Sequence, residues 1–223
     1  MKWSLLTLVV LLPLLSLSQT NEVPGLPPLS PEKAGFNAQE LGYVVSNIWT
    51  MPPGDFRGLV VIKDHQLVLE EHFHTFWRIS IHDIRSAGKS VTALLLGIAL
   101  KGGLIDNVDQ TVYQLLPKEK YPTLHNDYKN IKISHLLNMM SGLDADTDNT
   151  ETPGHAVHWG ALNEWKRYIL GIAATSKPGK KWVYADINPL VIAAIIEEKS
   201  GMSLRDYAKE KLFDPLGISQ YYW

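Results

Sequence analysis

The 223-residue sequence contains no cysteine, so disulfide bonds do not stabilise its fold and no cysteine is available for a lipid anchor. After the first residues it also has no run of about 20 apolar residues, the length that a transmembrane helix needs. The formal net charge of −2 provides no basic excess for nucleic acid or an anionic membrane. These absences predict an ordinary hydrophobic core, no stable membrane anchor and no nucleic acid partner.

The N-terminus is typical of a cleavable secretory signal. Lys2 supplies a positive charge, an apolar run covers residues 5–15, and small residues follow at Ser16 and Ser18. The run is too short to span a bilayer. We therefore predict a signal peptide over residues 1–18 and an exported protein, either periplasmic or extracellular.

The rest of the chain is predicted to form an extended, proline-rich arm over residues 19–34 and one domain over residues 35–223. Asn37 with Glu40 resembles a capping box and predicts a helix start. Two apolar runs broken at Asp64-His65 predict an antiparallel hairpin.

Four later segments have helical spacing. They begin at Ser86, Ser134, Asn188 and Ser203 and end near Lys101, Gly142, Gly201 and Asp214. The first is apolar on nearly every face, which predicts a helix enclosed in the core. Strands that come early and helices that follow predict an α+β fold, with an antiparallel sheet and not an alternating parallel one.

Two motifs overlap at the start of the first of these helices. Gly88-Lys89-Ser90 matches the end of a phosphate-binding loop, but such a loop needs glycine where this chain has Asp83. Ser86-x-x-Lys89 places a hydroxyl and an amine on one helix face, within reach of each other. Serine becomes a good nucleophile when a base takes its proton, and the positive end of the helix dipole favours the developing alkoxide. The competing interpretation is that Ser86 only caps the helix and Lys89 is solvated.

The surrounding sequence resembles the serine β-lactamase and penicillin-binding protein superfamily. The resemblance begins in "RSAGKSVTALLLGIALKGGLIDNVDQTVYQLLP" and continues in order through "IKISHLLNMMSGL", "WVYADINPLVIAAIIEEKSGMS" and "YAKEKLFDPLGI". It is strongest to the class C β-lactamase-related serine hydrolases, which include esterases, D-amino-acid peptidases and 6-aminohexanoate-dimer hydrolases. This resemblance implies a β-lactamase/transpeptidase-like fold, an antiparallel sheet flanked by helices plus a helical subdomain.

The resemblance also implies roles for individual residues. Ser86 matches the acylated nucleophile, Lys89 its lysine partner, and Tyr184 the tyrosine that relays a proton to the leaving group. Asp186 stands where class C β-lactamases usually have asparagine. An aspartate beside Lys89 would keep the amine protonated and move the work of the base toward Tyr184. Asp186 or Asn188 is also a candidate cap of the following helix.

The family's third motif, Lys-Thr-Gly or His-x-Gly on a strand, is absent from this sequence. Its strand normally supplies an oxyanion-hole amide, and the loss of one such donor costs about 10² to 10³ in rate. The resemblance therefore implies a domain that is incomplete at its C-terminus. The competing hypothesis is a catalytically weak or inactive binding protein or fragment of the same fold.

Neither a metal nor another cofactor is predicted. The acidic stretch from Asp144 to Glu151 resembles a calcium loop but lacks its glycine and its final glutamate. His72 and His74, and separately His155 and His158, lack a third convergent ligand for zinc. The resemblance places His158 and Trp159 beside the substrate pocket.

Together these patterns predict a serine hydrolase that cleaves a small-molecule ester or amide through an acyl-enzyme intermediate. An esterase, a D-amino-acid peptidase and an oligoamide hydrolase all remain open as its type. Peptidoglycan-derived peptides are among the candidate substrates.

Overall fold

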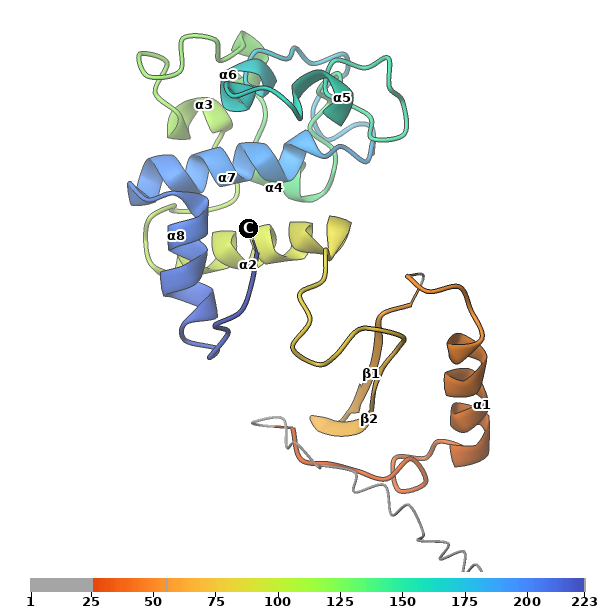
Figure 1. Cartoon of the computed structure of the whole chain (residues 1–223). Coiled ribbons are helices and arrows are strands. Elements are labelled where there is room, and N and C mark those ends of the chain that lie inside the picture. Colours follow the sequence, from red (N-terminus) through yellow and green to blue (C-terminus); the bar gives the residue numbers. More distant parts are fainter. Residues whose placement is uncertain (1–25, 55, 223) are drawn as a thin grey trace, which may run out of the picture. The chain divides into compact units, whose positions relative to one another are not determined.

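The computed structural model describes residues 26–54 and 56–222. The predicted signal peptide, residues 1–18, and the first part of the predicted arm lie outside them. The chain divides into two compact units, one ending at His82 and the other beginning at Asp83. Figure 1 shows the elements of both units.

The first unit contains one helix and one hairpin. Helix α1, Ala38–Trp49, begins as predicted, because the Asn37 side chain accepts hydrogen bonds from the backbone of Gln39 and Glu40. Strands β1, Gly58–Lys63, and β2, Gln66–His72, pair antiparallel. The predicted helix and the predicted hairpin are both confirmed.

The hairpin turn has the conformation that a tight two-residue connection requires. Asp64 and His65 both have positive φ, 51° and 60°, as in the turns that match the twist of paired strands. In the described part of the chain this sheet has two strands, and Val60 and Ile62 of β1 remain about half exposed.

The second unit is helical. Its elements, in chain order, are the 3₁₀ turn η1 (Arg85–Ala87), α2 (Gly88–Lys101), α3 (Val112–Leu115), the 3₁₀ turn η2 (Asn126–Lys129), α4 (Ile133–Leu137), α5 (Ala156–Trp159), α6 (Trp165–Ile169), α7 (Ile187–Ser200), α8 (Leu204–Ala208) and the π-helical turn η3 (Lys209–Phe213). Strands early and helices later confirm the predicted α+β class.

Helix α7 forms the centre of this unit. Its residues 191–196 are all buried, and helices α2, α3, α4, α6 and α8 pack against it. In Figure 1, α2 and α3 lie on opposite sides of α7. The helix ends as predicted at Gly201, whose φ of 70° is readily adopted only by glycine.

The prediction that the helix beginning at Ser86 is enclosed in the core is wrong. Thr92, Leu95, Leu96 and Ala99 of α2 are buried, but Leu94 on the other side is 58% exposed. An apolar sequence does not reveal which of its faces meets a neighbour. In the described residues α7, and not α2, is the enclosed helix.

The helix predicted to reach Gly142 is also shorter than expected. Helix α4 ends at Leu137, where the Asn138 side chain donates a hydrogen bond to the Ser134 carbonyl. Met139 then adopts a left-handed φ of 56°, which stops the helix. Gly142 lies close to Ser176: a Cβ atom added to Gly142 would be 2.2 Å from the carbonyl oxygen of Ser176.

The last predicted helix begins as expected, because the Ser203 hydroxyl accepts a hydrogen bond from the Asp206 backbone. After Ala208 it continues as the π-helical turn η3 up to Phe213. Among the residues that the structure describes, no helix combines the length and the apolar composition required to cross a bilayer.

Candidate active site

Ser86 lies just before the N-terminus of α2. It is the middle residue of η1. Helix α2 begins at Gly88, two residues after the predicted start at Ser86. The chain enters this turn through Arg85, whose φ of 49° is left-handed. Ser86 is exposed, and it remains close to the end of α2 that carries positive partial charge.

Tyr184 and Asp186 lie just before the N-terminus of α7. Backbone hydrogen bonds fix this segment: the amide of Val183 donates to the carbonyl of Met139, and the amide of Thr147 donates to the carbonyl of Tyr184. The Thr147 hydroxyl also accepts from the Asp186 amide, at 3.1 Å. Asp186 occupies the N-cap position, but its side chain makes no capping hydrogen bond.

The Lys89 ammonium group joins the two helix ends. Its Nζ lies 3.1 Å from Oγ of Ser86 and 2.6 Å from Oδ1 of Asp186, and it also hydrogen-bonds to Tyr184. An ammonium has three donors, and here each has an acceptor. The Nζ atom also lies 4.8 Å from the centre of the Tyr184 ring. The structure therefore brings together Ser86, Lys89, Tyr184 and Asp186.

These contacts change the acidity of Lys89. Partial burial alone would lower the pKa of the Lys89 amine, but hydrogen bonds to Asp186 and Tyr184 and their charges outweigh it. The net pKa is raised above 10.5, so the amine is a cation at neutral pH. Lys89 consequently has no free lone pair with which to act as a base.

The phenol of Tyr184 changes in the opposite direction. A hydrogen bond from Ser86 and another from Lys89 lower the pKa of Tyr184 below its usual 10.0. Both donors stabilise the phenolate more than the phenol. Ser86 thus accepts a hydrogen bond from the cation and donates one to the phenol oxygen, the arrangement needed to transfer its proton to Tyr184.

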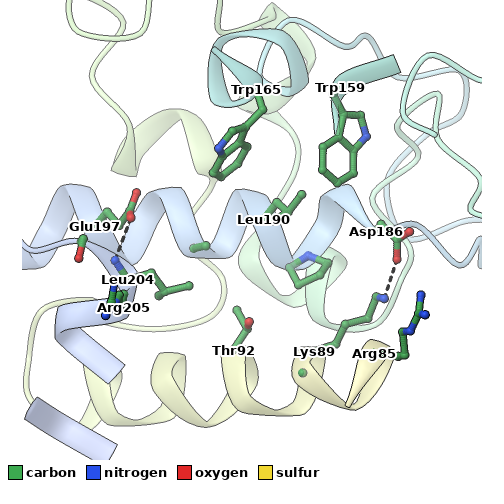
Figure 2. A pocket seen from close by; sticks show the side chains of 14 residues that line it. Arg85, Lys89, Thr92, Trp159, Trp165, Asp186, Leu190, Glu197, Leu204 and Arg205 are labelled. Carbon is green, nitrogen blue, oxygen red and sulfur yellow. Dashed lines mark hydrogen bonds and ion pairs between the residues drawn. The ribbon is translucent and has the colours of Figure 1, made fainter. Parts of the chain in front are cut away.

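A groove of about 550 Å³ extends from Lys89 along α7 (Figure 2). Two tryptophans, Trp159 and Trp165, line it on one side, and Thr92 of α2 lies across from them. Its two ends are marked by Arg85 with the Lys89–Asp186 pair, and by Glu197 with Arg205.

A second cavity, of about 430 Å³, adjoins Tyr184. Its other lining residues are Asp146, Asp148, Lys181, Trp182 and Val183, so it is more polar than the groove. The Trp182 ring stacks on Tyr184 with 6.3 Å between ring centres. The two cavities thus adjoin different members of the Ser86, Lys89 and Tyr184 group.

The two residues expected beside the pocket lie in different places. Trp159 lines the groove, and its Nε1–H donates to the Gly154 carbonyl at 2.9 Å. His158 is exposed and is not among the lining residues; its Nε2 lies 2.8 Å from the Thr150 carbonyl. Sequence reasoning missed Trp165, because no motif marks it and only the packing of α6 on α7 brings it to the groove.

The acidic loop from Asp144 forms local turns. Asp146 accepts a hydrogen bond from the Asp148 amide at 2.9 Å, and Thr152 donates its hydroxyl proton to backbone carbonyls of the same loop. Within residues 26–54 and 56–222, no three His, Asp or Glu side chains are grouped so that they could hold a metal ion.

Known proteins are similar in sequence to this chain. A protein of Escherichia coli O157:H7 with the provisional name D-alanyl-D-alanine carboxypeptidase is 26% identical over 88% of this chain and 50% of its own length. Penicillin-binding protein 4* of Bacillus subtilis is 30% identical over 63% of this chain and 30% of its own. The chain thus spans about half the length of the first relative and less of the second.

A solved structure is similar in fold to this chain. The penicillin-binding protein homologue from Pyrococcus abyssi superposes with a TM-score of 0.59, at 21% identity, over 83% of this chain and 44% of its own length. This likeness confirms the predicted β-lactamase/transpeptidase-like fold. Residues 54–223, which include Ser86, Lys89 and Tyr184, match the family described as Beta-lactamase, and the chain belongs to that family.

Proposed function

We propose that this chain contains the nucleophile-bearing part of a serine hydrolase that cleaves an ester or amide through an acyl-enzyme on Ser86. The observation that carries the proposal is the position of the Ser86 hydroxyl between the Lys89 cation and the Tyr184 phenol. The hydroxyl already makes the hydrogen bonds that deprotonation and attack require.

In the proposed reaction, Tyr184 as phenolate takes the proton of Ser86 while Oγ attacks the substrate carbonyl. Collapse of the tetrahedral intermediate breaks the bond to the leaving group, which receives the proton back from Tyr184. Tyr184 then takes a proton from water, whose oxygen attacks the acyl-enzyme, and the acid is released as Ser86 regains its proton. Throughout, Lys89 stays charged and stabilises the phenolate and the nearby oxyanion.

Asp186 is a positioning residue in this scheme. Its carboxylate holds the Lys89 ammonium at 2.6 Å and helps to keep it protonated, which leaves Tyr184 as the base. We also propose export, supported by the signal-like residues 1–18. Peptidoglycan-derived peptides are a candidate substrate class, supported by the carboxypeptidase name of the Escherichia coli relative.

Labelling with a fluorophosphonate probe tests the nucleophile. We expect peptide mass spectrometry to find the label on Ser86 and expect Ser86→Ala to remove it. Ser90→Ala is a matched control, because Ser90 is an exposed serine in the first turn of α2, and it should label normally. A folded protein without label would support the competing hypothesis of a binding protein.

A further inference from the structure

The groove beside Lys89 is long and straight. Asp186, Leu190, Ala193 and Glu197 follow at spacings of three or four residues, so they occupy one face of α7 and its N-terminus. Eleven residues of α-helix advance about 16 Å. Figure 2 shows Asp186 and Glu197 at opposite ends of the groove.

The middle of the groove is apolar. Leu190 and Ala193 lie on α7, Leu204 lies on α8, and two indole rings complete one wall. Trp159 is fixed by its hydrogen bond to the Gly154 carbonyl, and Trp165 is half-buried against the core. Between the charged ends, Thr92 and Ser203 are the polar side chains among the residues that line the groove. Such a wall favours a linear hydrocarbon chain.

The far end of the groove can bind an anion. The Glu197 carboxylate interacts with neighbouring residues: it accepts a hydrogen bond from the Leu204 amide at 2.8 Å and forms an ion pair with Lys166. The Arg205 side chain is exposed, and its guanidinium group makes no hydrogen bond or ion pair with another residue of the described segments. A guanidinium group matches a carboxylate in charge and in planar geometry.

The groove and the second cavity suit different parts of a substrate. The leaving group must receive a proton from Tyr184, so it belongs on the side of the polar cavity that Tyr184 lines. The groove instead begins at Lys89, whose ammonium contacts Ser86 Oγ. An acyl group on Ser86 therefore has the groove available for its chain.

We propose that the groove binds the acyl part of the substrate, a linear and mainly apolar chain that ends in a carboxylate held by Arg205. This inference rests on the proposed function, because it assigns an acyl group to Ser86. An extended chain advances about 3.5 Å for every three bonds, so about a dozen bonds fill the 16 Å of the groove. A dodecanedioyl group has this length and charge.

Binding of dodecanedioate to the full chain tests the groove without any chemical step. Calorimetry should show binding at least about 10-fold tighter than that of butanedioate, because the longer chain buries more methylenes. Arg205→Gln should weaken dodecanedioate binding about 3- to 5-fold, as for an exposed ion pair. Arg167 is an exposed arginine outside the groove, so Arg167→Gln should leave the affinity for dodecanedioate unchanged.

A blocking substitution provides a second test. Leu190→Trp fills the middle of the groove and should abolish the advantage of dodecanedioate over butanedioate. Leu94→Trp makes the same exchange at an exposed position of α2 outside the groove. This variant should retain the preference for dodecanedioate. Thermal melting shows whether each variant is folded, and Arg205→Gln, at the surface, still tests the groove if Leu190→Trp unfolds.

Hydrolysis separates the two proposals. Among p-nitrophenyl esters, the dodecanedioyl half-ester should exceed the acetyl ester in kcat/KM by at least about 10-fold, because more apolar chain is buried. Equal rates, together with equal binding of the two dicarboxylates, would overturn the groove assignment and leave the serine hydrolase proposal intact. Tight dodecanedioate binding without labelling of Ser86 would overturn the proposed function, and with it the acyl role of the groove.

Discussion

Helices α2 and α7 have the same length, 14 residues, but they are held in the protein very differently. α7 is surrounded by other helices, whereas α2 is buried on one face and exposes Leu94 on the other. Half of the candidate site nevertheless lies at or just before each N-terminus: Ser86 and Lys89 at that of α2, and Tyr184 and Asp186 at that of α7. The site thus joins a firmly packed helix end to one with fewer packing contacts.

The Lys89–Asp186 ion pair links these two helices. Lys89 lies at the start of α2, and its ammonium reaches across to two groups at the start of α7. Two helix N-termini that converge also favour negative charge between them, both on the phenolate and on the developing alkoxide. Substitutions at the two helix ends should therefore have separable effects.

Tyr184→Phe removes the base contributed by the α7 end. We expect kcat/KM to fall about 10² to 10⁴-fold, the usual contribution of general acid–base catalysis. In the unaltered protein, activity should rise with pH through the lowered pKa of Tyr184, below 10.0, and Tyr184→Phe should abolish this rise. Steady-state hydrolysis of p-nitrophenyl acetate between pH 5 and 10 measures both effects.

Tyr113→Phe is the matched control for this substitution. Lys129 lies 4.9 Å from the Tyr113 ring centre, so the control repeats the cation–ring contact of Tyr184 away from Ser86. It should leave both the rate and the pH profile unchanged. An unchanged rate in Tyr184→Phe would contradict the role of this phenol.

Ile195→Ala tests the packing of α7 against that of α2. Ile195 is fully buried, so its truncation should cost about 2 to 5 kcal/mol in the free energy of unfolding. Leu94→Ala removes an exposed leucine and should change that free energy by less than about 0.5 kcal/mol. Denaturant unfolding measures both values, and equal losses would show that the exposed face of α2 is also packed.

Asp186→Asn breaks the link between the two helices with little change in shape. Without this carboxylate the pKa of Lys89 decreases, so the amine loses its proton at lower pH and the alkaline fall in activity begins earlier. At pH 7 the rate should decrease by less than about 10-fold, as for a partly exposed ion pair. The pH profile of kcat/KM measures the shift.

Asp109→Asn is the control for Asp186→Asn. It breaks a 3.0 Å ion pair with Lys132 that involves none of the four site residues. Its pH profile should match that of the unaltered protein. If Asp186→Asn also leaves the alkaline limb in place, the carboxylate does not set the protonation of Lys89.

The four residues of the candidate site belong to two short sequence motifs, and this is why they could be named as candidates before the structure. Ser86 and Lys89 are three residues apart, and Tyr184 with Asp186 precedes a helix that is predicted from Asn188 and begins at Ile187. Their convergence depended on family resemblance, since about a hundred residues separate the two pairs. The consequence of Asp186 for Lys89 followed from elementary electrostatics, and the raised pKa agrees with it.

Features that depend on packing were not predictable. The apolar composition of α2 and of α7 is similar, so only the three-dimensional arrangement reveals which of them is enclosed. The early end of α4 depends on the left-handed Met139, for which no glycine or proline gives a signal. Trp165 reaches the groove through the packing of α6 on α7.

Rapid mixing of p-nitrophenyl acetate with the full chain tests directly whether Ser86 is acylated. An acyl-enzyme on Ser86 predicts a burst of p-nitrophenol that approaches one equivalent per chain, with an acetyl group on the Ser86 peptide after acid quenching. Ser86→Ala should show neither. Turnover without a burst, or acetylation that persists in Ser86→Ala, would contradict the assignment of Ser86 as the nucleophile.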